Sequence, residues 1–220
     1  MNKLISLNLL MAVPILGAVA IWNPPLAMAD MVSYTTSLQS SNMCTICGPF
    51  GTVTVSPVSG FSNKISVGLS LTPGEVFANT GAGAALLFNI ANDPMLAVSN
   101  LTSGFSFVQQ PTHADGSGDW NTYIACDVCG AGTSPPQNSG PISFTLAVAG
   151  GTLSPSSFVT NNNNYLFASD IGVPNGSGGY YTGDVVTSSS LTPVPLPAAA
   201  WLMLSGLGGL GWLSRKQKSS

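Results

Sequence analysis

Residues 142–148 read Ile-Ser-Phe-Thr-Leu-Ala-Val, and residues 65–71 read Ile-Ser-Val-Gly-Leu-Ser-Leu. In both stretches apolar residues alternate with small or polar ones, so every second side chain lies on the same face of an extended chain. This alternation predicts β-strands that pack one face against a core. Further runs of strand type lie at 52–55, 85–90, 105–108, 120–126, 165–168 and 180–186.

Turn-forming residues separate these runs, as in Pro73-Gly74, in Asp115-Gly116-Ser117-Gly118 and in the four asparagines at 161–164. No segment between them has the ten or more helical residues that a crossover between parallel strands needs. We therefore expect an all-β domain over residues 30–186, built as an antiparallel β-sandwich of jelly-roll-like type.

The composition favours a protein that works outside the cytosol. Only 6% of the 220 residues are charged, against roughly 25% in ordinary soluble proteins. Of the basic residues, Lys64 alone lies between the two terminal segments, and it shares that middle region with all eight acids. Because nucleic acid binding depends on Lys and Arg to neutralise phosphates, this charge balance excludes nucleic acid as a partner.

The N-terminus has the three parts of a secretory signal peptide. Lys3 supplies a positive start, an apolar run extends to Ile21, and Ala27-Met28-Ala29 follows two prolines. A small residue on each side of one larger residue is the typical cleavage pattern. We expect residues 1–29 to be removed on export, so that the mature chain begins at Asp30.

The C-terminus predicts a membrane anchor. Residues 198–213 are apolar or small except for Ser205, and a basic cluster follows. A run of about 17 residues is at the lower limit for crossing a bilayer as a helix. By the positive-inside rule, the basic end stays in the cytoplasm and the β domain lies outside. The cluster consists of Arg215, Lys216 and Lys218.

The start of this tail has a specific motif, Val194-Pro195-Leu196-Pro197-Ala198. With the apolar run and the basic end, it resembles the PEP-CTERM sorting signal of the VPLPA variety, over residues 194–220 only. The resemblance implies a Gram-negative bacterium that makes extracellular polysaccharide, and an exosortase-type membrane enzyme as the processing partner. The prototype has Pro-Glu-Pro where this chain has Pro-Leu-Pro. The polar segment 187–193 is expected to be a flexible linker between domain and tail.

The four cysteines form two Cys-x-x-Cys-Gly motifs, which begin at Cys44 and at Cys126. In an exported protein an even number of cysteines favours disulfides. Four thiolates in two such motifs could instead bind zinc, although a separation of this length is unusual for a zinc ribbon. We expect no cofactor and a disulfide between the motifs, which would close a long loop and stabilise the fold. The cysteines are Cys44, Cys47, Cys126 and Cys129.

Two further features could carry chemistry, and each has a simpler interpretation. The single histidine, His113, is expected in a loop, and a general base there would need a nucleophile and an orienting acid nearby. Asp115 and Asp119 alternate with glycines as in part of a calcium loop, but the chain lacks the glutamate that completes an EF-hand. A solvated histidine and an ordinary glycine-rich turn are the favoured interpretations.

These observations favour a non-catalytic protein, exported, anchored by its tail and sorted to the cell surface or a polysaccharide matrix as a structural or adhesive component. The alternative is a carbohydrate-binding module, because exposed aromatic rings can stack on sugars. A secreted hydrolase is a third class, which would need clustered acids or a triad built on His113. The aromatic candidates for sugar binding are Trp120, Tyr123, Tyr180 and Tyr181.

Overall fold

The computed structural model of the protein describes residues 33–41, 48–80, 84–134, 137–187 and 190–194. Within these ranges the chain is all-β and antiparallel, as expected, and it has no α-helix, only the 3₁₀ turn η1 (Pro155–Ser157). The strands are β1 (Tyr34–Ser41), β2 (Gly51–Pro57), β3 (Lys64–Leu71), β4 (Val76–Phe77), β5 (Ala84–Ile90), β6 (Leu96–Ser99), β7 (Phe105–Ala114), β8 (Gly118–Cys126), β9 (Ile142–Val148), β10 (Phe158–Val159), β11 (Phe167–Pro174), β12 (Tyr180–Thr187) and β13 (Thr192–Pro193).

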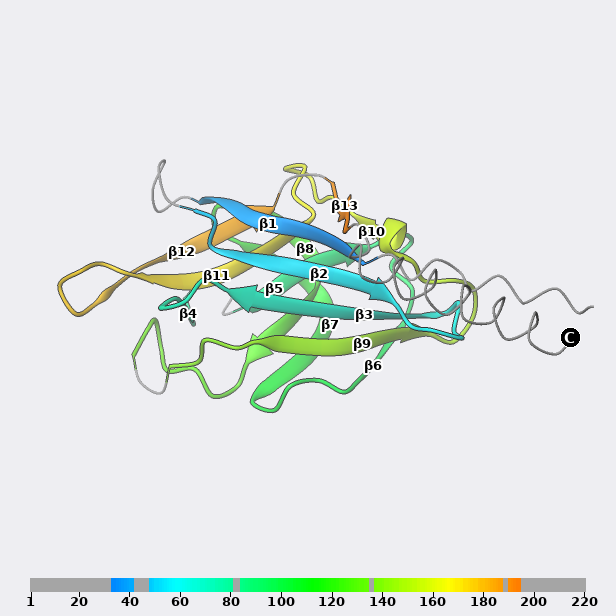
Figure 1. The fold of residues 1–220 in the computed structure, drawn as a ribbon, viewed down its shortest axis with the longest axis horizontal. Coiled ribbons are helices and arrows are strands. Elements are labelled where there is room, and N and C mark those ends of the chain that lie inside the picture. Colours follow the sequence, from blue (N-terminus) through cyan, green and yellow to red (C-terminus); the bar gives the residue numbers. More distant parts are fainter. Residues whose placement is uncertain (1–32, 42–47, 81–83, 135–136, 188–189, 195–220) are drawn as a thin grey trace, which may run out of the picture.

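The strands form two layers that face each other (Figure 1). One layer runs β6-β9-β3-β2-β1 and the other β12-β11-β5-β8-β7. Between them lies an apolar core in which Phe88 of β5 stacks on Phe144 of β9, with ring centroids 6.0 Å apart. Because β5 and β9 are not neighbours in the sheet, this contact joins the two layers across the interior.

The sandwich expected from the sequence differs from the structure in one respect. Its two sheets would be separate, whereas here β1 pairs with β12, with Leu38 opposite Thr187, and this makes one continuous sheet that is nearly closed as a barrel. Strands from the two ends of the domain therefore provide the join. Alternation of apolar residues, which was the basis of the sandwich prediction, determines which face is buried but not which edges pair.

The opposite edge, between β6 and β7, is bridged by one side chain instead of a ladder. The amide of Gln109 in β7 accepts a hydrogen bond from the backbone N–H of Leu96 at 3.0 Å. It donates to the carbonyl of Pro94 at 2.7 Å. A glutamine side chain carries the same donor and acceptor as a peptide group, so it can substitute locally for strand pairing.

Strand β5 lies in the middle of the layer whose outer face carries the polar network described below. All seven of its residues are buried, because the main core covers one face and a second apolar cluster covers the other. Leu87 of β5, Ala168 of β11 and Trp120 of β8 belong to this outer cluster. Loops cover the outer face of this layer, and polar residues gather in these loops.

We expected segment 187–193 to be a flexible linker. Its described residues contact the strand domain. Thr187 is the last residue of β12, and its hydroxyl accepts a hydrogen bond from the backbone of Phe167 at 3.0 Å. Leu191 packs against the main core, and Thr192–Pro193 forms β13 along β1. The described residues of this segment, 187 and 190–193, therefore include strand residues and a residue that packs on the core.

Candidate functional site

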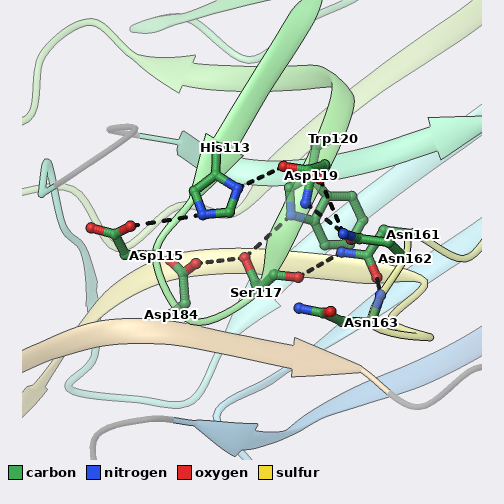
Figure 2. A network of polar contacts seen from close by, with 9 residues as sticks. All are labelled: His113, Asp115, Ser117, Asp119, Trp120, Asn161, Asn162, Asn163 and Asp184. Carbon is green, nitrogen blue, oxygen red and sulfur yellow. Dashed lines mark hydrogen bonds and ion pairs between the residues drawn. The ribbon is translucent and has the colours of Figure 1, made fainter.

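A polar network lies on the outer face of the β5-β8-β11-β12 layer (Figure 2). It is formed by the adjoining ends of β7 and β8 with the turn between them, by the asparagine-rich loop at 161–164 and by β12. Its members are His113, Asp115, Ser117, Asp119, Trp120, Asn161, Asn162, Asn163 and Asp184.

Ser117 is the centre of this network. Its side chain is fully buried, and its hydroxyl donates to Asp184 of β12 at 2.6 Å while accepting from the indole N–H of Trp120 at 3.2 Å. Its backbone carbonyl accepts from the amide of Asn161 at 2.6 Å. One serine therefore connects the hairpin turn to β12, to β8 and to the asparagine-rich loop.

The asparagine-rich loop is shaped by side chain to backbone hydrogen bonds. The Asn161 carbonyl oxygen accepts from the backbone N–H groups of Asn163 and Tyr165, each at 3.0 Å. Asn162 makes a double contact with Asp119, since it accepts from the backbone N–H at 3.2 Å and donates to the carboxylate at 3.0 Å. Gly118 lies beneath this loop with φ +98°, and an added Cβ would come within 2.7 Å of Asn163. Glycine is needed here for both its conformation and its size.

His113 lies in strand β7, not in the loop expected from the sequence, and it faces Asp119 across the β7–β8 ladder. Its Nδ1 is 2.6 Å from an Asp119 oxygen, and its Nε2 is 3.9 Å from Asp115. The hydrogen bond to Asp119 raises the pKa of His113, and the charges of both aspartates act in the same direction. This ring is exposed to solvent, so the pair is a surface interaction.

The described contacts do not pair the Ser117 hydroxyl with the His113 ring. The Ser117 hydroxyl bonds to Asp184 and Trp120, whereas the described contacts of the His113 ring are with Asp115 and Asp119. A serine nucleophile would need its hydroxyl within hydrogen-bond reach of the imidazole. Asp115 and Asp119, the residues of the calcium hypothesis, face the two nitrogens of the same ring (Figure 2).

Two aspartates that the sequence did not single out lie directly opposite each other in the β11–β12 pair. Asp170 is 3% exposed and Asp184 is 9% exposed. One oxygen of Asp170 accepts two hydrogen bonds from Thr80, and its other oxygen, Oδ1, is buried without a hydrogen-bond partner among the described residues. Two carboxyl groups placed this way disfavour simultaneous ionisation.

Burial is the main cause of the altered titration of this pair. It raises the pKa of Asp184 to about 6, and the charges of Asp170 and Asp115 add to the increase while the bond from Ser117 opposes it. Burial also raises the pKa of Asp170, against the two bonds from Thr80. Lys64, the only Lys or Arg in the described part of the chain, lies over the ring of Phe61. Among the described residues, the acid pair therefore has no Lys or Arg side chain as a partner. The sequence indicated a buried charge only through Asp184, an isolated aspartate inside the strand-like run 180–186.

The aromatic residues proposed to stack on sugars differ in their accessibility. Trp120 is 1% exposed and belongs to the outer apolar cluster, so its ring is not available at the surface. Tyr123 and Tyr180 are half-buried, and their hydroxyls bond to Gln110 and Gln137, each at 3.2 Å. Tyr181 is 63% exposed. It lies in the β11–β12 hairpin, which reaches beyond the other strands (Figure 1).

The second cysteine motif closes on itself, contrary to the cross-link that we expected between the motifs. Cys126 and Cys129 form a disulfide with their Cα atoms 5.5 Å apart. These two sulfurs are thus bonded to each other and not to Cys44 or Cys47. The resulting loop is fixed to the β7 side by Asp127, whose N–H donates to Gly104 at 2.9 Å and whose carboxylate accepts from Ser106 at 2.7 Å.

Several predicted residues lie outside the described part of the chain. Among the residues that the structure does describe, no helix is long and apolar enough to span a membrane. Of the sorting motif, Val194 alone is described, and its side chain is 39% exposed. The predicted residues that lie outside are Ala27, Ala29, Cys44, Cys47, Pro195, Leu196, Pro197, Ala198, Arg215, Lys216 and Lys218.

Comparison with known proteins found no matching family model, no similar curated protein and no similar solved structure.

Proposed function

We propose that this is an exported, non-catalytic protein, anchored by its C-terminal tail and then sorted to the cell surface or the surrounding polysaccharide matrix, where it acts as a structural or adhesive component. The processing partner is an exosortase-type membrane enzyme. The tail sequence 194–220, with its motif, apolar run and basic end, supports the sorting part of this proposal.

The hydrogen bonds made by the buried polar residues support the non-catalytic part of the proposal. Ser117 bonds to Asp184, and Asn161 bonds to the backbone of Ser117 and to the backbone of its own loop. Side chains engaged in this way fix the positions of loops and contribute stability. A structural or adhesive protein outside the cell needs a stable domain of this kind more than a reactive site.

Cell fractionation tests the sorting part. We expect the full chain to pass through the membrane fraction and reach the surface, where an epitope inserted between Gly176 and Ser177 would be accessible in intact cells. A chain lacking residues 194–220 is expected in soluble form. If the truncated chain is distributed like the full chain, the tail is not an anchor and the proposal is wrong.

Binding to extracellular polysaccharide is a second candidate function, and the exposure of Tyr181 favours it. An exposed tyrosine on a projecting hairpin can stack on a sugar ring. We expect Tyr181→Ala to abolish retention of the protein on a column of the host polysaccharide. Phe61→Ala, which removes another half-exposed aromatic ring, is the matched control and is expected to retain binding. Equal retention of wild type and Tyr181→Ala would remove this candidate.

A further inference from the structure

The two ends of the described domain lie side by side on β1 (Figure 1). Tyr34 and Thr35, near the start of β1, pair with Pro193 and Thr192 of β13. Strand β2 already occupies one edge of β1 at these residues. Strand β13 must therefore occupy the other edge, which β12 occupies further along at Leu38. The segment before the tail continues along the same strand edge as β12.

Three kinds of contact hold this segment. The backbone N–H of Val194 donates to the carbonyl of Ser33 at 2.7 Å. The hydroxyl of Thr192 donates to the carbonyl of Thr35 at 2.9 Å. Leu191 packs against the main core and, with Tyr34, lines a cavity of about 370 Å³. The attachment therefore includes the first residue of the tail motif itself.

The register of the β1–β13 pair explains why it can contain Pro193. In an antiparallel ladder, alternate residue pairs exchange backbone hydrogen bonds. The bond from Val194 to Ser33 makes theirs a bonded pair, so the next pair, Tyr34 with Pro193, exchanges none. A proline has no N–H to donate, and it fits a strand edge at such a position. The sequence Thr192-Pro193-Val194 is thus suited to a docked conformation.

We infer that β13 is a strap that withholds the tail motif from its processing enzyme until β13 separates from β1. This inference rests on the proposed sorting function and adds a control step to it. Val194 is the first residue of the motif, and its backbone N–H is bonded to Ser33 in the docked state, so this donor is not free to bond to an enzyme that reads the motif. Strand β13 ends at Pro193 and the motif begins at Val194, so no spacer separates the folded domain from the motif.

A disulfide lock tests the strap in the full-length chain. Residues opposite each other in a non-bonded antiparallel pair have Cα atoms about 4.5 Å apart, within the range that a disulfide bridges. Tyr34→Cys with Pro193→Cys would covalently fix β13 to β1. In a host that contains the processing enzyme, we expect loss of the tail, followed by mass spectrometry, to slow by about tenfold or more, as local opening is suppressed. Each single cysteine variant is a control for the substitutions.

Two further variants make the result specific. A flexible spacer of glycine and serine inserted between Pro193 and Val194 of the locked variant separates the motif from the strap and is expected to restore tail loss to the wild-type rate. Thr192→Pro removes a backbone donor at a bonded pair, so it is expected to accelerate tail loss and hydrogen exchange at the Val194 amide.

The outcomes separate the strap from the sorting proposal. If the locked variant, with its disulfide confirmed by mass, loses the tail at the wild-type rate, the strap is wrong and the sorting function stands. If neither the wild type nor the wild type with the spacer loses its tail in that host, the processing proposal is wrong and the strap's role is refuted with it.

Discussion

Strand β5 and most of β11 are buried on both faces of their layer, but by different means. The inner face packs against the opposite layer through apolar side chains, with Phe88 in contact with the rings of Phe144, Phe158 and Phe167. The outer face is covered by loops, and there the buried groups include Asp170, Asp184 and Ser117. The stability contributed by the apolar face is sensitive to lost side-chain volume, whereas that contributed by the polar face is sensitive to lost hydrogen bonds and to pH.

The largest effect is expected from a cavity on the inner face. Replacing Phe88 with alanine removes a ring that contacts three others, and we expect the free energy of unfolding to fall by about 3–5 kcal/mol. Urea denaturation measures this change. Phe61→Ala is the matched control, because Phe61 is 50% exposed, and it is expected to change stability by less than about 1 kcal/mol. Similar losses in the two variants would contradict the assigned core.

A smaller effect, dependent on pH, is expected on the outer face. The pKa of Asp184 is raised to about 6 in the folded state, whereas an unfolded aspartate titrates near 4. The stability that this group contributes is therefore fully present below about pH 4, and it is lost as the pH rises through about 6. For this one group, we expect unfolding to become easier by about 2 kcal/mol between those limits.

Asp184→Asn removes this dependence, because the amide can still accept the bond from Ser117 but does not ionise. We expect the difference in unfolding free energy between variant and wild type to be small at pH 4 and to favour the variant at pH 7. Asp93→Asn, at an exposed acid, is the control and should keep the wild-type slope. A variant whose stability follows the wild-type pH profile would show that Asp184 is not buried as described.

The smallest effect is expected from loosening the loop that covers this face. Asn161→Ala removes three hydrogen bonds, one to Ser117 and two from the loop backbone. We expect a loss of about 1–2 kcal/mol. The pH dependence should be unchanged, because Asn161 does not contact the carboxyl groups in the described network. Asn162→Ala, at an exposed position in the same loop, is expected to cause less than half that loss, and the reverse order would refute the proposed role of Asn161.

Strands with clean alternation could be predicted from the sequence, and those with mixed composition could not. The runs at 65–71 and 142–148 correspond to β3 and β9. Strand β1 was missed because it is rich in serine and threonine and contributes Leu38 as its buried apolar residue. Most of β11 was missed because it contains Asp170, Gly172 and Pro174, residue types depleted in strands. Burial on both faces overrides those propensities.

The candidate site was predicted in part. The residues from His113 to Asp119 were identified as a possible source of chemistry, but their partners lie about 40 or more positions further along the chain, at Asn161, Asn162 and Asp184. No local pattern links these positions. The pairing of Cys126 with Cys129 was also not predicted. We expected a disulfide between the two motifs, and whether the motifs meet depends on the folded structure and not on their spacing in the sequence.

The sequence by itself determined the class of structure, whereas the targeting segments that it predicts lie, except for Val194, outside the described residues. Local alternation, turn residues and the lack of helical periodicity are properties of neighbouring residues, and they predicted an all-β antiparallel domain. The tertiary structure alone decided that β1 and β12 join the layers, that Asp170 faces Asp184, and that Thr192–Pro193 docks on the first strand. Each of these depends on which edges meet after the chain has folded, and edge pairing is set by the summed packing of distant segments, which no short stretch of sequence contains.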